Sequence, residues 1–432
     1  MSTSQYRQVL TDSFPPEISI TVGETTLVYR KEIYTIRDGE GGERTDGLRY
    51  GENPGQEAAL YRLVNGNLAI AGVEWVAPGL PLVSGLSDMD PKTSMMYGCR
   101  KHPSKTNLTD VDSALNALRH MEGSPAAVVV KHNNPSGAAT DGDLSEAFRK
   151  AYEGDAVAAF GGAAVVNRSL DKKTAEMMNS KYLEVVAAPD YEEGAVGILG
   201  AKPDLRIFKI KNISRLGELA HRRFLDIKSL IDGGVVLQQS PDNRILSPAD
   251  FLPAECEHRG VLYRSERAPD ERELKDLCFG WAVEQAVVSN SVLFVKDGAT
   301  VAIAGGQQDR VGVVEIAVFK ARRNYAELLC MRKHGMLTGD LEKKAKGDPP
   351  LAKELDSFKA EAARERGGLP GSVLVSDAFF PFRDALDAAI REGITAVTHP
   401  GGAIRDYESL EAANEASPKV AMVFTGQRAF KH

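Results

Sequence analysis

A lysine and a histidine stand side by side at the end of an apolar run. Lys131 and His132 follow the segment AAVVV and precede NNPSG. Catalytic groups commonly lie where a buried strand meets its loop. An imidazole, with a reference pKa of about 6.5, accepts a proton at neutral pH, and a neighbouring ammonium stabilises negative charge as it develops. The pair predicts proton transfer beside a charged transition state. The alternative is a strand end with incidental charges, and these residues alone leave both open.

Two further blocks carry polar groups next to turns. Arg49 and Tyr50 precede a Gly and an Asn-Pro turn, where they could hold a phosphate by a bidentate contact. Asn290, in SNSVLFVKDG, could fix an amide or formyl oxygen, and Gly305-Gly306 would let the backbone approach a flat ligand. Each block has a plain structural alternative: a turn that leads into a strand, and a hairpin with polar ends.

The last sixty residues contain an aromatic cluster. Phe379, Phe380 and Phe382 surround Pro381 and could wall an aromatic ligand, with Asp384 available to a pterin-like edge. A core aromatic cluster is the alternative.

The chain ends in MVFTGQRAFKH, and common motifs of other enzyme classes are missing. Arg428 and His432 would suit a phosphate site, whereas the alternative is a solvated end. The sequence has no GxxxxGK[ST] phosphate loop and no GxGxxG after a strand. His120-Met-Glu122 matches H-x-E, but no PCxxC follows, so a zinc deaminase is not supported and no catalytic metal is expected.

Bulk composition limits the class of protein. The chain has 432 residues, of which 43% are hydrophobic, so it can bury more than one core. The net charge of −7 disfavours a nucleic-acid partner. The four cysteines form no CxxC pair, which argues against a disulfide framework and indicates a reducing cytosol. The N-terminus does not resemble a signal peptide, and no apolar stretch approaches the ~18 residues that span a bilayer, so a cytoplasmic protein is expected.

The elements that must position these groups alternate between strand and helix patterns, which predicts an α/β fold. Strands ending in loops are expected in 126–134, 372–382, 394–402 and 419–426, helices in 144–154, 273–288 and 383–393, a strand-turn-strand in 156–166 and a hairpin in 291–306. The charged segment from Leu337 to Gly371 predicts an exposed helical excursion, at about 328–369.

Together these blocks resemble the transformylase half of the bifunctional AICAR transformylase/IMP cyclohydrolase family. LRYGENPGQ is similar to the family's LRYGENPHQ, and KHNNPSGAA is similar to its KHxNPxGxA loop. The blocks AFGG, APDYEE, SNSVLFVKDG, SDAFFPFRD, PGGAIRD and the ending RAFKH resemble further family blocks in the same order. The resemblance runs from about Leu48 to His432, and its specificity lies in that shared order.

The resemblance implies a fold of two cytidine-deaminase-like α/β/α domains without zinc. The first domain would cover 48–220, with the helical excursion at about 328–369 assigned to it, and the second 221–432. Residues 1–47 would form an N-terminal extension in place of the cyclohydrolase domain. It also implies a homodimer with active sites at the interface, and a structural potassium ion.

The implied activity is formyl transfer from 10-formyltetrahydrofolate to the 5-amino group of AICAR, in the synthesis of IMP. The resemblance assigns catalysis to Lys131, His132 and Asn290. It assigns nucleotide binding to Arg49, Tyr50, Asn107, Gly161, Lys202, Arg428 and His432. It assigns folate binding to Arg310, Phe379, Pro381, Phe382 and Asp384.

This sequence also departs from the family pattern. Gly55 replaces a histidine, Pro203 replaces the second lysine of a pair, Ala403 replaces a serine, and about 87–100 resembles an insertion. The segment that precedes LRYGENP is too short for a cyclohydrolase domain, so we expect no ring closure to IMP and a separate cyclohydrolase in the pathway. The changes near the site leave open a formyltransferase with a non-folate donor, and a non-catalytic nucleotide-binding relative.

Overall fold

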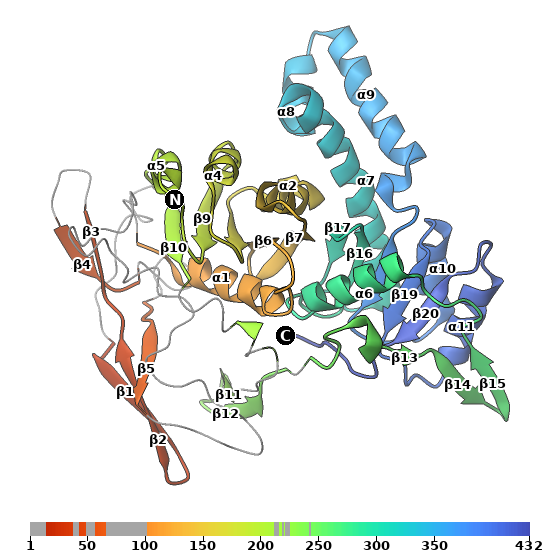
Figure 1. The fold of residues 1–432 in the computed structure, drawn as a ribbon, viewed down its shortest axis with the longest axis horizontal. Helices are drawn as coiled ribbons and strands as arrows, with labels where there is room; N and C mark the ends of the chain where they lie inside the picture. Colours follow the sequence, from red (N-terminus) through yellow and green to blue (C-terminus); the bar gives the residue numbers. More distant parts are fainter. Residues whose placement is uncertain are drawn as a thin grey trace. The chain divides into compact units, whose positions relative to one another are not determined.

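A computed structural model describes residues 14–37, 43–48, 57–65, 102–210, 216–217, 220, 225–241 and 243–432. The chain divides into two compact units that are each discontinuous in sequence. The first consists of Met1–Leu115 and Gly161–Asn243, and the second of Asn116–Phe160 and Arg244–His432. Figure 1 shows the strands and helices of both units, which confirm the predicted α/β fold.

The second unit is built on a mixed sheet. Its strands lie in the order β6 (Ala126–Lys131), β7 (Asn134–Thr140), β17 (Ala299–Ala304), β16 (Val292–Lys296), β18 (Val373–Ser376), β19 (Ala396–His399), β20 (Ala421–Phe424) and β13 (Leu252–Pro253). The neighbours β18, β19 and β20 are parallel, and the other pairs are antiparallel. A two-stranded ribbon, β14 (Glu255–His258) with β15 (Val261–Arg264), completes the strands of this unit that the structure describes.

Alternate residues of the central strands face different helices, because side chains point to opposite faces with a period of two. Val292 and Phe294 belong to a core that includes residues of α7 (Arg310–His334), α10 (Arg383–Arg391) and α11 (Asp406–Glu415). Leu293 points the other way, toward α6 (Glu271–Glu284), where a Cβ on Gly280 would lie 3.1 Å from Leu293 Cδ1. The central strands are therefore covered on both faces, which explains why they appear in the sequence as continuous apolar runs.

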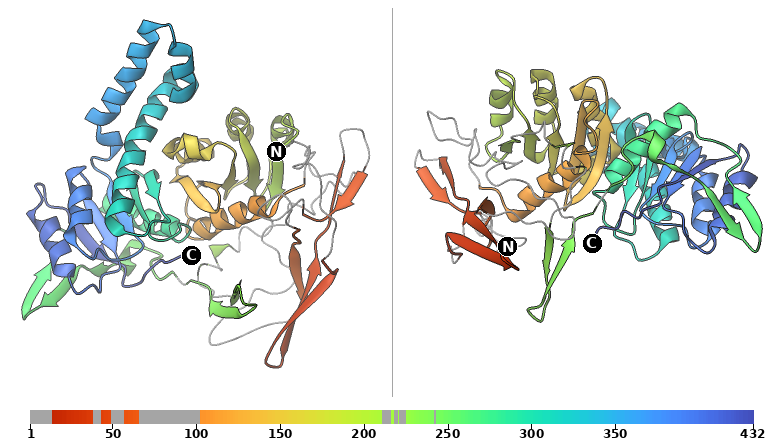
Figure 2. Two further views of the ribbon diagram at one scale, coloured as in Figure 1. Left: turned by 180° about the vertical axis from the view of Figure 1, so that it is seen from behind. Right: turned by 60° about the horizontal axis from the view of Figure 1, so that its bottom comes forward.

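Three helices form a projecting arm in the second unit. The helix α7 extends past the sheet, as the left view of Figure 2 shows, and its end packs with α8 (Thr338–Ala345) and α9 (Pro349–Arg364). A separate apolar cluster that includes Cys330, Leu341 and Phe358 holds the arm together. A 3-10 turn, η4 (Arg366–Gly368), leads from the arm to β18. The helical prediction for this charged segment is confirmed.

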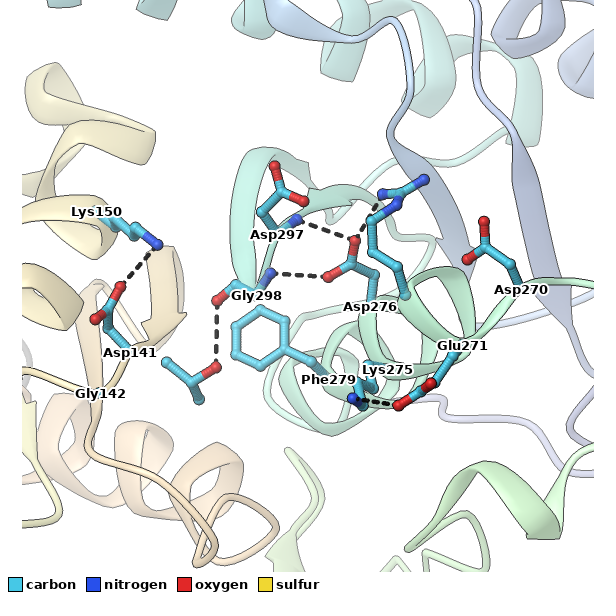
Figure 3. Close-up of a pocket in the computed structure, with 12 residues that line it drawn as sticks. Asp141, Gly142, Lys150, Asp270, Glu271, Lys275, Asp276, Phe279, Asp297 and Gly298 are labelled. Carbon is cyan, nitrogen blue, oxygen red and sulfur yellow. Dashed lines mark hydrogen bonds and ion pairs between the residues drawn. The ribbon is translucent and has the colours of Figure 1, made fainter.

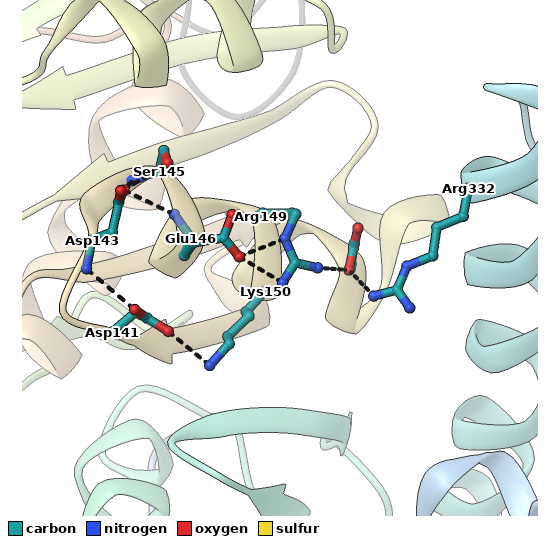
Figure 4. Close-up of polar contacts among 8 residues, drawn as sticks. Asp141, Asp143, Ser145, Glu146, Arg149, Lys150 and Arg332 are labelled. Carbon is teal, nitrogen blue, oxygen red and sulfur yellow. Dashed lines mark hydrogen bonds and ion pairs between the residues drawn. The ribbon is translucent and has the colours of Figure 1, made fainter.

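Ion pairs hold the helix that follows β7. In α2 (Leu144–Gly154), Asp143 Oδ1 accepts from the backbone N–H of Ser145 at 2.7 Å and caps the helix. Arg149 bridges Glu146 and Glu153, and Arg332 of α7 contacts the same Glu153 at 3.0 Å (Figure 4). The pair of Lys150 with Asp141 ties α2 to the end of β7.

The first unit contains smaller sheets. The strands β10 (Arg206–Lys209), β9 (Leu183–Ala188) and β8 (Gly162–Val166) are parallel and accompany α4 (Lys172–Asn179) and α5 (Ala195–Gly200). An antiparallel sheet has the order β1 (Glu17–Val22), β2 (Thr25–Lys31) and β5 (Tyr61–Asn65). Two further ribbons pair β3 (Tyr34–Arg37) with β4 (Glu43–Asp46) and β11 (Leu225–Ser229) with β12 (Val235–Gln239). The boundary between the units falls within α1 (Lys105–Leu118).

Two sequence predictions were wrong in detail. The first half of 156–166 was expected to be a strand but forms the short helix α3 (Ala156–Ala159), because Asp155 caps it at the Ala158 N–H and alanine favours helix. The segment NPSGAA was expected to be a loop but forms β7. Gly137 is needed there, since a Cβ would lie 2.0 Å from the carbonyl oxygen of Ala151 in α2.

Candidate active site

The predicted catalytic pair lies on a tight hairpin turn, which we call the KHNN turn (Lys131–Asn134). Lys131 pairs with Asn134 across β6 and β7, so His132 and Asn133 are the two turn residues. Both have left-handed backbones, with φ of 57° and 61°, as a type I′ turn requires. The His132 side chain is exposed, and Lys131 Nζ donates to the carbonyl oxygen of Phe160 at 2.5 Å. The turn therefore presents the imidazole outward while the ammonium is anchored to a backbone oxygen.

The KHNN turn is fastened to the segment that carries Asn290. The backbone N–H of Val288 donates to Asn134 Oδ1 at 3.0 Å. From the chain end, Lys431 Nζ donates to the carbonyl oxygen of Asn133 at 3.2 Å. The structure thus brings three segments that are far apart in the sequence to one place in the second unit.

Asn290 is held in one orientation. Its backbone N–H donates to the Gln307 carbonyl oxygen at 3.1 Å, and Arg310 donates from its NH2 group to Asn290 Oδ1 at 2.9 Å. Because a guanidinium only donates, the carboxamide oxygen must face Arg310, and the Nδ2 hydrogens must point away from it. Asn290 is therefore arranged as a hydrogen-bond donor toward a ligand.

Gly305 and Gly306 serve the packing of this segment. A Cβ on Gly305 would lie 2.6 Å from the carbonyl oxygen of Val288, and the same oxygen accepts from the Gly306 N–H at 2.7 Å. The contact between two backbone segments explains the glycine at 305 without a flat ligand.

Behind Asn290 lies a set of ionisable groups that we call the buried ion network: Glu284, Arg310, Asp377 and His399. Arg310 is 8% exposed, Asp377 is 0% exposed, and Arg310 donates from its NH1 nitrogen to Asp377 Oδ1 over an N–O distance of 2.5 Å. Arg310 NH1 also lies within 2.9 Å of the Ser291 carbonyl oxygen and of Ser376 Oγ. Burying two charges is tolerated because each has several partners. Arg310 was predicted to contact folate; its described contacts are with this network and with Asn290.

The other two members of the buried ion network have shifted pKa values. Burial, and then the negative charge of Asp377, raises the pKa of Glu284 well above its usual value, although Ser291 Oγ donates to Glu284 Oε1. Burial, and then the positive charge of Arg310, lowers the pKa of His399 to about 3. Burial thereby favours the protonated form of Glu284 and the neutral form of His399, beside the ion pair of Arg310 with Asp377.

The predicted aromatic wall is partly exposed and lies under arginines. The Arg428 guanidinium carbon is 5.0 Å from the centre of the Phe379 ring, and Arg405 stands at the same distance from Phe382. Phe382 is 54% exposed, whereas Phe380 is buried against His399. Phe379 and Phe382 therefore present π-faces with cations beside them, and only Phe380 matches the alternative of a core aromatic cluster.

The remaining predicted residues of the second unit lie at the surface. Pro381, Asp384, Arg428 and His432 are exposed. Asp384 Oδ1 accepts from the Ala385 N–H in the first turn of α10, and the His432 ring lies 5.8 Å from that of Phe430.

Asn107, in the first unit, closes the start of a helix. Asn107 Oδ1 accepts from the Ser104 N–H at 3.0 Å, while Ser104 Oγ accepts from the Asn107 N–H at 3.3 Å. This reciprocal pair has the geometry of a capping box at the N-terminus of α1. Asn107 Nδ2 also donates to Glu184 at 3.4 Å.

The other predicted nucleotide residues lie in the first unit or outside the described residues. Gly161 has a left-handed backbone, with φ of 75°, and donates to the Tyr182 carbonyl oxygen at 2.8 Å. Lys202 Nζ donates to a backbone oxygen, that of Lys181, and burial lowers its pKa. Arg49 and Tyr50 lie outside the described residues.

Sequence reasoning missed Asp377, Glu284 and Lys431. Asp377 lies within the block SDAFFPFRD, so its place in a family block was a usable signal, whereas Glu284 lies in an ordinary amphipathic helix. Lys431 was not predicted as a site residue, because the sequence assigned the phosphate site at the chain end to Arg428 and His432.

One pocket of about 730 Å³ lies elsewhere in the second unit, near the Asp297-Gly298 turn (Figure 3). Its charged groups mostly pair with each other, as Arg272 does with Asp276 at 3.1 Å and Lys275 with Glu271 at 2.7 Å. None of the residues that the sequence assigned to catalysis or to substrate binding lines it.

Two further searches cover the part of the chain that the structure describes. No helix there has the length and apolar character that crossing a membrane requires. No group of three or more histidine, cysteine, aspartate and glutamate residues there is arranged to hold a metal ion.

Comparison with known proteins gives consistent matches. The sequence model of the "AICARFT/IMPCHase bienzyme" family matches residues 3–320. The chain is 34% identical to the bifunctional purine biosynthesis protein PurH of Caldicellulosiruptor saccharolyticus over 390 residues, which cover 90% of this chain and 60% of that protein. The PurH protein of Persephonella marina is 36% identical, with the same two coverages. That of Rhodopirellula baltica is 32% identical over 462 residues, which cover 100% of this chain and 71% of that protein. The chain thus spans about three fifths of the length of the first of these relatives.

Proposed function

Because the chain belongs to the AICARFT/IMPCHase bienzyme family, we propose that it transfers a formyl group from 10-formyltetrahydrofolate to the 5-amino group of AICAR. The products are the formylated nucleotide and tetrahydrofolate, within purine biosynthesis. One observation supports this most: the KHNN turn, the residues Val288 and Ser289 that lead to Asn290, and the chain end are joined by hydrogen bonds in one unit.

The reaction needs the help that these groups offer. The 5-amine of AICAR is a poor nucleophile, because the imidazole ring and the carboxamide withdraw its lone pair. Its attack on the formyl carbon forms a C–N bond, an oxyanion and a cationic nitrogen. His132 takes the proton from that nitrogen, and the donors of Lys131 and Asn290 stabilise the oxyanion. The bond from the formyl carbon to the folate nitrogen then breaks, and this nitrogen is protonated as tetrahydrofolate leaves.

The buried ion network supports the donor role of Asn290. Arg310 occupies the carboxamide oxygen of Asn290, so the Nδ2 hydrogens are already directed before substrate binds. Preorganised donors of this kind typically contribute about 10²–10³ in kcat. Orientation of two bound substrates contributes at least as much.

Substrate contacts complete the proposal. Phe379, Pro381, Phe382 and Asp384 receive the folate, with Arg310 acting behind Asn290. Arg49, Tyr50, Asn107, Gly161, Lys202, Arg428 and His432 receive the nucleotide. We also propose two cytidine-deaminase-like domains, a homodimer that shares its active sites and, from the resemblance, a structural potassium ion.

A single assay tests the activity. Purified protein is mixed with AICAR and 10-formyltetrahydrofolate, and the absorbance change of tetrahydrofolate formation is followed. Formate with ATP replaces the folate in a parallel reaction, which separates a folate donor from another donor. Absence of turnover with either donor, while AICAR binds, would identify a non-catalytic nucleotide-binding relative. Chromatography of the products shows whether any IMP forms.

A further inference from the structure

The second-last residue of the chain joins three segments of the second unit. Lys431 Nζ donates to the carbonyl oxygens of Ala286 at 2.9 Å and Asn133 at 3.2 Å. The Lys431 backbone N–H lies 3.3 Å from Ser289 Oγ, and the Lys431 carbonyl oxygen accepts from the Ser289 N–H at 2.9 Å. The ammonium and the backbone of one residue therefore hold the KHNN turn, the end of α6 and the segment next to Asn290.

The turn that Lys431 holds has a demanding backbone. His132 and Asn133 are not glycines, yet both lie in the left-handed region. This region is disfavoured for residues that carry a Cβ unless surrounding contacts impose the conformation. The Lys431 ammonium binds the carbonyl group directly after His132, so it supplies one of these contacts.

The second carbonyl group explains why a cation suits this place. Ala286 follows the C-terminus of α6. Carbonyl groups at a helix C-terminus lack helical partners and carry partial negative charge, which a cation stabilises. Backbone carbonyl oxygens are also the ligands with which proteins coordinate potassium. The oxygens of Ala286 and Asn133 therefore form a site for a monovalent cation, and the ammonium of Lys431 lies against both.

We propose that Lys431 is a positioning residue whose ammonium acts as a built-in monovalent cation. Lys431 fixes the imidazole of His132 relative to Asn290, because it binds the backbone of Asn133, next to His132, and the backbone of Ser289, next to Asn290. The effect of Lys431 on the rate rests on the proposed formyl transfer, whereas its role as a cation in the fold does not.

Removing the ammonium should create a cation requirement. In Lys431→Ala, we expect kcat to fall about 10- to 100-fold with a smaller change in KM, because catalytic groups are displaced while the substrate contacts remain. Ammonium chloride should restore part of kcat, and tetramethylammonium chloride at the same ionic strength should not, because its cation is too large and has no hydrogen to donate. Wild-type protein is measured in the same two salts, because ammonium also fits the proposed structural potassium site. The rescue is the response of Lys431→Ala beyond that of wild type.

Variants of matched size sharpen the test. Lys431→Met keeps most of the stem without the charge, so it should lose kcat and should not be rescued. Lys275→Met is the control, because Lys275 pairs with Glu271 at the surface; its kcat should stay within twofold of wild type.

A thermal readout separates this inference from the proposed function. The Tm of Lys431→Ala should be higher in ammonium chloride than in tetramethylammonium chloride, and this difference should be larger than the one that wild-type protein shows between the same salts. That result in a protein without formyl transfer activity would leave the cation role standing and reject the function. If Lys431→Ala is recovered only unfolded, the yield on refolding in the two salts gives the same comparison. Equal responses of Lys431→Ala to the two salts, or a wild-type kcat in Lys431→Met, would overturn the inference.

Discussion

The KHNN turn and the buried ion network both contain ionisable side chains, but the surroundings of those side chains are opposite. His132 is exposed on a turn of two left-handed residues. Arg310 and Asp377 are buried, and Arg310 is bonded to Asp377, to two serines and to Asn290. The KHNN turn can contact a substrate, whereas the charged groups of the buried ion network already have hydrogen-bond partners within the protein.

The difference indicates how the two regions divide the work. Exposed groups contribute little to folding, so their loss should affect turnover. Buried groups with several partners fix the position of Asn290. Their loss should therefore lower the free energy of unfolding first, and should lower turnover only because Asn290 is displaced. The first three predictions each change a residue of one of these two regions. The last tests Asn107, which lies in the first unit.

The largest effect is expected at His132. In His132→Ala, kcat for formyl transfer should fall by about 10²–10⁴, because the general base is lost, while AICAR binding measured by calorimetry survives. The free energy of unfolding should change by no more than about 0.5 kcal/mol at this exposed site. His132→Asn is the matched control for the backbone, since asparagine tolerates the left-handed conformation, and it should lose the same rate. An unchanged kcat in both variants would contradict the assignment.

The next largest effect is expected in the buried ion network. Asp377→Asn leaves the Arg310 guanidinium buried beside a neutral amide, so the free energy of unfolding in urea should fall by about 3–5 kcal/mol. Asp387→Asn is the control, because Asp387 pairs with Arg383 at a partly exposed site and should contribute only about 0–1 kcal/mol. Equal losses in the two variants would mean that burial does not distinguish the pairs.

Glu284 should make stability fall as the pH rises. Its pKa is raised in the folded protein, so above about pH 4.5 the folded state binds a proton that the unfolded state releases. The unfolding free energy should therefore decline by up to about 1.4 kcal/mol per pH unit until the folded-state pKa is passed. Glu284→Gln keeps the acceptor for Ser291 and should remove this decline. Urea titrations of both proteins from pH 5 to pH 9 measure it, and parallel profiles would contradict the prediction.

The smallest effect is expected at Asn107, which the sequence placed among the nucleotide ligands and the structure places in a capping box. Asn107→Ala should destabilise the protein by about 0.5–1.5 kcal/mol, because the Ser104 N–H loses its hydrogen bond to Asn107 Oδ1. Asn107→Glu rebuilds the S-x-x-E box and should recover most of that stability. If KM for AICAR rises in the glutamate variant while its Tm is restored, Asn107 also contacts the nucleotide. If KM follows Tm in both variants, its role is limited to the helix.

The sequence by itself determined most helices and strands and the chemical groups of the candidate site, because both depend on short segments of neighbouring residues. Apolar runs such as VLFVK predicted buried strands, and Asp297-Gly298 predicted the turn of the hairpin from β16 to β17, since both residues accept positive φ. The errors at α3 and β7 are also local in origin. At α3 the Asp155 cap starts a helix, and at β7 the two-residue turn of His132 and Asn133 pairs the segment with β6.

Only the tertiary structure decided which residues hold the reacting groups in place. Lys431 contacts Asn133 across 298 positions of sequence, and Arg310 contacts Asp377 across 67. No periodicity or spacing in the sequence predicts such pairs. Side chains that are distant along the chain come into contact only after the strands between them have paired. The charge states of Glu284 and His399 follow from the same folding step, because burial next to Asp377 and Arg310 sets their pKa values.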